Sequence, residues 1–177
     1  MKLIPLTLAV LATATFSYAA DGDDTAKRSA ELQVLDRFVG SWDIDVTIKL
    51  ANGEANTSKT TEKRAWSLGG EFVHFQNPAA ENPQDPEFHM LVTYDPATKT
   101  YPGVMMFGGN RTLTKGTWDQ KRNTMTFHGS SPDDGGSFVF KNRFIDKDHS
   151  ESTGILKNAK WVVFMEMTQK QTRRVPD

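Results

Sequence analysis

The side chains best suited to acid–base chemistry or metal binding are four histidines, His74, His89, His128 and His149. No two of them stand at His-x-x-x-His or another metal-ligand spacing. Cysteine is absent, which removes thiol nucleophiles and thiolate ligands. The sequence therefore predicts no metal site and no cofactor. Among the histidines, His74 is the candidate for the interior if Phe72 faces inward, whereas an inward Val73 and Phe75 would place it outside.

The remaining nucleophiles and carboxylates give no catalytic pattern. The chain lacks the Gly-x-Ser-x-Gly sequence of serine hydrolases. Asp43 and Asp45 alternate with apolar residues, so we expect both on a solvated strand face. Asp133 and Asp134 lie in a glycine-rich turn that lacks the later ligands of an EF-hand calcium loop. We predict no catalytic residue from these groups.

One set of charged residues could serve a ligand. Glu62 and Arg64 share a strand face with Trp66, so an inward Trp66 would bring an ion pair into the protein. A buried charge is costly unless it is paired, so such a pair, joined by Arg111, would form a polar anchor for a ligand. The alternative is a strand bulge that turns these side chains to solvent.

The elements that must position these residues are strands. Residues 42–50 alternate without a break, with Trp42, Ile44 and Val46 on one face and charged residues on the other. A period of two over this length predicts a half-buried antiparallel strand. Further strands are predicted at 57–67, 71–77, 87–95, 100–107, 111–118, 123–129, 136–145, 150–157 and 160–170.

Turn and helix signals complete this pattern. Asn52-Gly53, Gly69-Gly70 and Asp133–Gly136 are typical of turns between strands about ten residues apart. The segment 77–86 holds three prolines and is the longest predicted loop, which could lie over a barrel mouth. Residues 29–39 form the one helix candidate, with Ser29 as N-cap and Gly40 as terminator.

Three segments in order resemble one family. Residues 35–42 resemble the helix-to-first-strand junction of calycins (lipocalin-like proteins), and 66–73 and 94–101 resemble two hairpins of a family of secreted bacterial proteins of unknown function. The resemblance implies a closed antiparallel barrel and no established activity. It also implies that Arg173 or Arg174 stacks on Trp42; the alternative is a solvated basic tail after the last strand. Some ten-stranded calycins hold haem through a histidine near the C-terminal end, but residues 150–177 contain none.

We therefore predict an all-β fold, a closed antiparallel up-and-down barrel of eight to ten strands with a short N-terminal capping helix. The lumen is either a ligand cavity lined by methionines and aromatic rings or an ordinary packed core. The predicted lining comprises residues at alternate strand positions: Trp42, Ile44, Val46, Trp66, Phe72, His74, Met90, Val92, Met106, Phe127, Phe138, Phe140, Val163 and Met165.

The chain ends and the charge indicate where the protein acts. Residues 1–19 have the short basic start, apolar run and small cleavage-site residues of a secretory signal peptide, with cleavage near Ala19. Residues 20–30 are expected to form a flexible linker and 31–172 the barrel domain. No membrane span is predicted in the mature chain. The net charge of −1 gives no basis for nucleic-acid binding.

Three functions remain open at this point. The leading hypothesis is a secreted or periplasmic protein that holds a small apolar or amphipathic molecule in the barrel. The second is an enzyme, an isomerase or hydrolase, that uses the same cavity through an interior titratable group. The third is a structural or interaction module of the cell envelope with a filled barrel.

Overall fold

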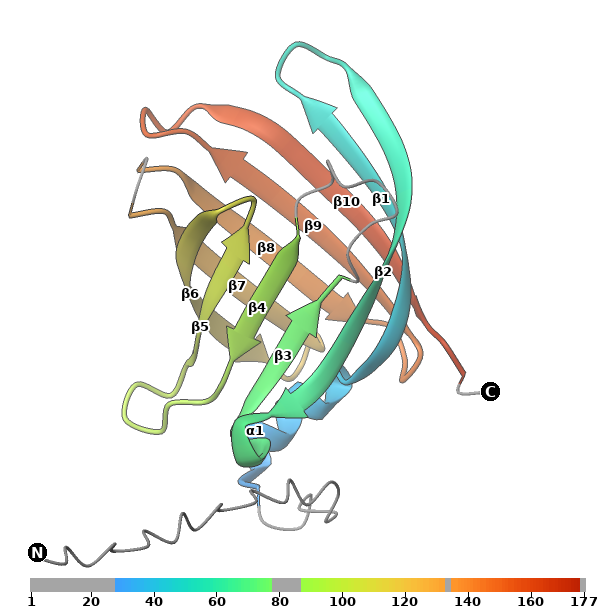
Figure 1. The fold of residues 1–177 in the computed structure, drawn as a ribbon, viewed down its shortest axis with the longest axis vertical. Helices are drawn as coiled ribbons and strands as arrows, with labels where there is room; N and C mark the ends of the chain where they lie inside the picture. The colour runs from blue at the N-terminus through green and yellow to red at the C-terminus, as the bar shows by residue number, and fades with distance from the viewer. Residues whose placement is uncertain (1–27, 78–86, 133–134, 176–177) are drawn as a thin grey trace, which may run out of the picture.

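The protein is an all-β barrel in the computed structural model, which describes residues 28–77, 87–132 and 135–175 (Figure 1). Each strand pairs antiparallel with its neighbour in the chain, and β10 pairs with β1 to close the barrel. The predicted fold class is therefore confirmed, at the upper end of its strand range. The strands are β1 (Gly40–Leu50), β2 (Ala55–Ser67), β3 (Phe72–Gln76), β4 (Phe88–Val92), β5 (Tyr101–Phe107), β6 (Asn110–Asp119), β7 (Thr124–Ser130), β8 (Ser137–Phe144), β9 (His149–Lys157) and β10 (Val163–Arg173).

All ten predicted strands are present, but the last one begins late. The predicted start at 160 falls in the turn before β10, where the Asn158 side chain accepts hydrogen bonds from the backbone N–H groups of Lys160 and Val162. A register shift follows between Val163 and Met165. The bulge breaks the alternation on which a sequence-based assignment of faces depends.

A short helical segment, residues 30–38, closes one end of the barrel and is called the plug (Figure 1). It consists of an α-helical turn, α1 (Ala30–Gln33), and a 3₁₀ turn, η2 (Val34–Arg37). The predicted N-cap is confirmed, because the Ser29 hydroxyl accepts a hydrogen bond from Leu32 N–H. Leu35 and Phe38 are buried and insert into the barrel interior. A second 3₁₀ turn, η3 (Leu68–Gly70), connects β2 to β3.

Trp42 anchors the junction between this plug and the barrel. Its side chain is fully buried, and its indole N–H donates to the carbonyl of Phe38 at 2.7 Å. The Arg173 guanidinium lies 4.6 Å from the centre of the Trp42 ring, as the calycin resemblance implied. Gly40 has φ of 134°, and a Cβ there would meet Arg173. The junction therefore favours glycine at this position.

Inward-facing glycines lie opposite phenylalanines on neighbouring strands. Gly154 pairs with Phe140, and Gly129 pairs with Phe138. A Cβ at Gly154 would overlap the Phe140 ring. The rings thus occupy the space that side chains on the adjacent strand would fill, and the barrel interior remains closely packed at these points.

This packing makes Gly154 sensitive to a single methyl group. We expect Gly154→Ala to lower the free energy of unfolding by about 1–3 kcal/mol, because the Phe140 ring must leave its position. Urea unfolding followed by tryptophan fluorescence measures the change. Gly53→Ser is the control, since a Cβ at Gly53 meets nothing within 4 Å, although its φ of 89° adds a small local cost. A loss for Gly154→Ala no greater than for the control would contradict the expectation.

Several predicted features lie outside the described residues. These are the signal peptide at 1–19, the linker as far as residue 27, the loop at 78–86 and the carboxylates Asp133 and Asp134. The end of the predicted linker is packed, because the Arg28 guanidinium lies 4.0 Å from the Trp66 ring and Ala30 begins α1. No described helix is long and apolar enough to cross a membrane.

Candidate functional site

The barrel encloses a cavity of about 350 Å³. Phe38 of the plug forms one end, and Ile48, Phe107 and Met165, which stand near strand ends on the opposite side, line the other. Cavities that bind small molecules have volumes of roughly 300–1,000 Å³, so this one suits a small ligand. Among the described residues, the only ionisable side chains in its lining are Glu62 and Arg64.

Most of the cavity wall is apolar. Two rings, Phe138 and Phe140, have centres 5.0 Å apart, and four methionines line the same cavity. Methionine side chains are flexible, so such a wall adapts to ligands of different shape. The apolar lining consists of Phe38, Ile48, Phe75, Phe88, Met90, Met105, Phe107, Phe127, Phe138, Phe140, Leu156, Met165 and Met167.

A row of polar side chains crosses the remaining wall, from β2 to β10. The Arg64 guanidinium donates from Nε to Glu62 Oε2 at 2.8 Å and from Nη2 to Gln171 Oε1 at 2.9 Å. Gln171 then donates to Gln169 Oε1 at 2.8 Å. Gln169 donates to the sulfur of Met167 at 3.4 Å, which is a weak acceptor. The row is thus continuous along the wall and ends on a thioether.

Arg64 lies in an unusual environment for a cation. Its side chain is 3% exposed. Its guanidinium carbon lies 5.1 Å from the Trp42 ring, 5.3 Å from Phe75 and 6.0 Å from Phe38. Glu62 is its one ion-pair partner among the described residues. The third guanidinium nitrogen, Nη1, is buried and has no hydrogen-bond partner.

Seven of the predicted site residues line this cavity. They are the ion pair and five apolar side chains: Glu62, Arg64, Met90, Phe127, Phe138, Phe140 and Met165. Five more pack in the hydrophobic core of the barrel but do not border the cavity: Trp42, Ile44, Val46, Trp66 and Val92. Trp66 packs under the helix, where its indole N–H donates to Asp36 at 2.8 Å.

The other five predicted residues face outward, and their assignment to the lumen needs correction: Phe72, His74, Met106, Arg111 and Val163. In β3 the interior is occupied by Val73 and Phe75, so the alternation places Phe72 and His74 outside. Met106 pairs with both His89 and Arg111 on the outer surface. Val163 precedes the bulge and is 36% exposed.

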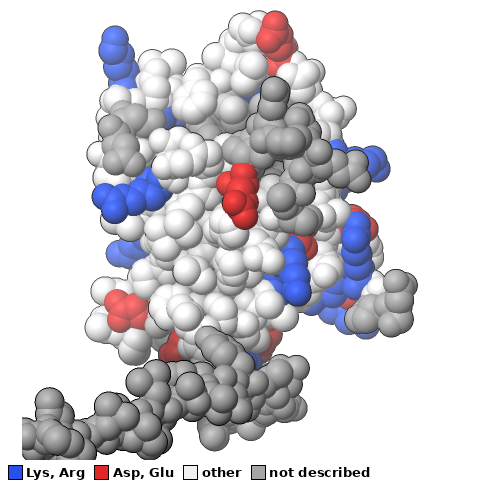
Figure 2. Space-filling model, viewed as in Figure 1, with Lys and Arg blue, Asp and Glu red and all other residues white. Residues whose placement is uncertain are grey.

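The outer surface explains why these faces are hard to assign from sequence. Figure 2 shows few charged side chains in the middle of the face over β3, β4 and β5. Leu91 and Val104 stand opposite each other on this outer face, and neither is charged. When both faces of a strand are weakly polar, alternation marks the strand but not its inner side.

His74 and His89 meet on this outer face. Nε2 of His74 lies 3.0 Å from Nδ1 of His89, and the rings stack with centres 5.2 Å apart. His89 Nε2 is 2.9 Å from a carboxylate oxygen of Glu87. Burial, with a smaller contribution from His89, lowers the pKa of His74 below its usual value. The described residues hold no group of three potential ligands that could bind a metal ion.

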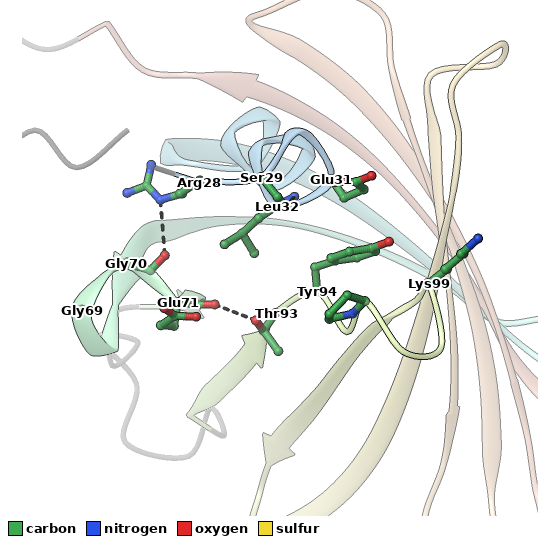
Figure 3. A pocket seen from close by; sticks show the side chains of 11 residues that line it. Arg28, Ser29, Glu31, Leu32, Gly69, Gly70, Glu71, Thr93, Tyr94 and Lys99 are labelled. Carbon is green, nitrogen blue, oxygen red and sulfur yellow. Dashed lines mark hydrogen bonds between the residues drawn. The ribbon is translucent and has the colours of Figure 1, made fainter. Parts of the chain in front are cut away.

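A second hollow lies outside the barrel, between α1 and the turns after β2 and β4 (Figure 3). Its volume is about 560 Å³. Arg28 donates to the carbonyl of Gly70 at 3.3 Å, and Thr93 donates to the carbonyl of Glu71 at 2.7 Å across it. These groups hold the turns against the helix. The cavity inside the barrel combines a larger apolar wall with a buried cation, so we take it as the candidate site.

The ten-stranded barrel and its helical plug form a lipocalin-like, calycin-type fold around the interior cavity. The chain belongs to the family described as "Protein of unknown function (DUF1579)", whose model matches residues 27–171. No curated protein matches the chain.

Solved structures share this fold at low sequence identity. Rv2717c from M. tuberculosis has a TM-score of 0.63 and 14% identity over 83% of this chain and 99% of its own. The S-type phycobiliprotein lyase CPES from Guillardia theta has a TM-score of 0.60 and 11% identity over 89% and 100%. A DUF3598 protein of unknown function from Nostoc punctiforme has a TM-score of 0.55 and 10% identity over 79% and 48%. These likenesses support the fold alone.

Proposed function

We propose that this protein is secreted or periplasmic and binds one small apolar or amphipathic molecule inside its barrel. The observation that carries the proposal is the cavity of about 350 Å³, whose wall is mostly apolar and carries one row of polar side chains with a buried ion pair. A barrel that served only as a packed scaffold would fill this space with side chains. The cavity therefore supports ligand binding over the alternative of a filled interaction module.

The arrangement of ionisable groups supports binding over catalysis. An isomerase or hydrolase would need an acid, base or nucleophile that reaches the bound molecule. In the described cavity lining, the carboxylate of Glu62 already accepts a hydrogen bond from Arg64. His74 lies on the outer surface of the barrel and does not reach the cavity. The secretory location rests on the signal-like residues 1–19.

Two adjacent threonines offer a matched test. Thr60 lines the cavity, whereas Thr61 pairs with Asp43 on the outer face, and both are half-buried. We expect the uncharged dye N-phenyl-1-naphthylamine to bind with increased fluorescence at one site per chain. A Thr60→Trp substitution fills the cavity and should weaken dye binding at least tenfold, which corresponds to about 1.4 kcal/mol. Thr61→Trp should leave the dissociation constant within about twofold.

Fluorescence titration of the three proteins measures these constants, and circular dichroism checks that both variants keep the parent β-sheet spectrum. If Thr61→Trp weakens binding as much as Thr60→Trp, the dye binds outside the barrel. Absence of any saturable binding to the parent protein would also contradict the proposed function.

A further inference from the structure

We propose that the bound molecule carries an uncharged hydrogen-bond acceptor oxygen, such as the carbonyl of a ketone or ester, and that Arg64 Nη1 donates to it at the plug end of the cavity. This inference rests on the proposed function and adds the chemical class of the ligand and its orientation. The apolar part of the molecule then lies along the phenylalanines and methionines toward the opposite end.

The first support is an unused donor in a buried place. Arg64 lines the cavity, and two of its three nitrogens are bonded to Glu62 and Gln171. Its Nη1 has no partner, although its side chain is only 3% exposed. Buried polar groups in proteins are almost always hydrogen-bonded, and a donor on a charged group is the costliest to leave unpaired. The surrounding rings of Trp42 and Phe75 offer only their π faces.

The second support is a weakly satisfied donor on the same wall. Gln169 also lines the cavity, and its amide N–H donates to the Met167 sulfur at 3.4 Å. A thioether is a poor acceptor, so an oxygen of the ligand would be a better partner for this amide. Arg64 Nη1 and this amide are both donors. The site therefore selects for acceptor atoms in the ligand.

The charge balance indicates that the acceptor is uncharged. Glu62 and Arg64 neutralise each other and are the only ionisable groups in the described lining. A carboxylate ligand would add a net negative charge next to Glu62, in a place of low dielectric constant. A carbonyl oxygen takes the Nη1 hydrogen bond without that cost. The cavity is thus matched to a neutral amphiphile rather than to a fatty acid anion.

Displacement of N-phenyl-1-naphthylamine by ligands of matched shape tests this inference. The series is undecane, 2-undecanone and undecanoate, which share a chain length and differ in the head group. For the parent protein we expect 2-undecanone to bind at least tenfold more tightly than undecane, because a hydrogen bond from a charged donor is among the stronger ones. Undecanoate should bind more weakly than 2-undecanone at pH 8.

The double variant Glu62→Gln/Arg64→Met removes both charges together, so that neither is left buried alone. In this variant, whose own dye dissociation constant is measured first, the preference for 2-undecanone over undecane should fall to about twofold or less. Equal affinities for the ketone and the alkane in the parent protein would overturn the inference and leave the proposed function standing. If undecanoate binds most tightly of the three, the inference that the ligand's acceptor oxygen is uncharged is wrong. If the dye itself does not bind, the proposed function and the inference both fail.

Discussion

A Trp42→Ala variant is expected to lose about 3–5 kcal/mol of unfolding free energy, the largest effect of any single substitution considered for this protein. The indole is fully buried and donates to the Phe38 carbonyl, so its removal leaves both a large void and an unpaired acceptor. The guanidiniums of Arg64 and Arg173, 5.1 and 4.6 Å from the ring, lose their aromatic contact as well. Small domains are stable by only about 5–15 kcal/mol, so this loss is severe.

Urea unfolding followed by circular dichroism measures this loss, with Trp161→Ala as the matched control. Trp161 is 72% exposed in the turn before β10, so we expect its removal to change stability by no more than about 0.5 kcal/mol. A Trp42→Ala variant that unfolds at the same urea concentration as the control would show that the plug does not depend on this residue.

The second large effect is expected from Glu62→Gln, which retains the shape of the side chain but removes its charge. The Arg64 guanidinium, 3% exposed, then has no counter-ion within the described cavity lining. Breaking one partner of a buried ion pair costs about 3–5 kcal/mol, and the 14% exposure of Glu62 favours the lower end of that range. Urea unfolding at pH 7 measures the loss.

An exposed ion pair of similar geometry provides the control. Lys59 lies 3.0 Å from Asp45, with side chains 87% and 62% exposed, so Asp45→Asn should cost no more than about 1 kcal/mol. The double variant Glu62→Gln/Arg64→Met should recover most of the stability that Glu62→Gln loses. Equal small losses for Glu62→Gln and Asp45→Asn would show that water reaches Arg64.

The barrel was predictable because its strands carry local signals. Apolar and polar residues alternate over the whole of residues 42–50, and the buried positions of β1 are all apolar. Glycine, asparagine and proline mark most turns, so the approximate positions of the strands follow from composition, whereas a boundary such as the start of β10 does not. The closure of the barrel could be predicted only from the resemblance to calycins, because no local sequence pattern indicates which distant strand pairs with β1.

The candidate site was only partly predictable, for two physical reasons. The inner and outer faces of β3 and β5 are similar in polarity, so Phe72, His74 and Met106 were assigned to the wrong side, and the bulge at Val163 did the same in β10. The phase of Glu62 and Arg64 with Trp66 predicts one half of the polar row, but an apolar pattern does not mark the other half, Gln169 and Gln171, because both side chains are polar. Gln169 and Gln171 lie two and four residues after Met167, so they share the strand face of Met165 and Met167. This spacing is the signal that could have identified them.

Native mass spectrometry of the protein purified from its own secretory compartment tests the central claim most directly. The account predicts one small molecule of uniform mass per chain in the parent protein and in Thr61→Trp, and a much lower occupancy in Thr60→Trp. Identical ligand-free masses for all three proteins, together with no thermal stabilisation by any apolar or carbonyl-bearing compound, would contradict it.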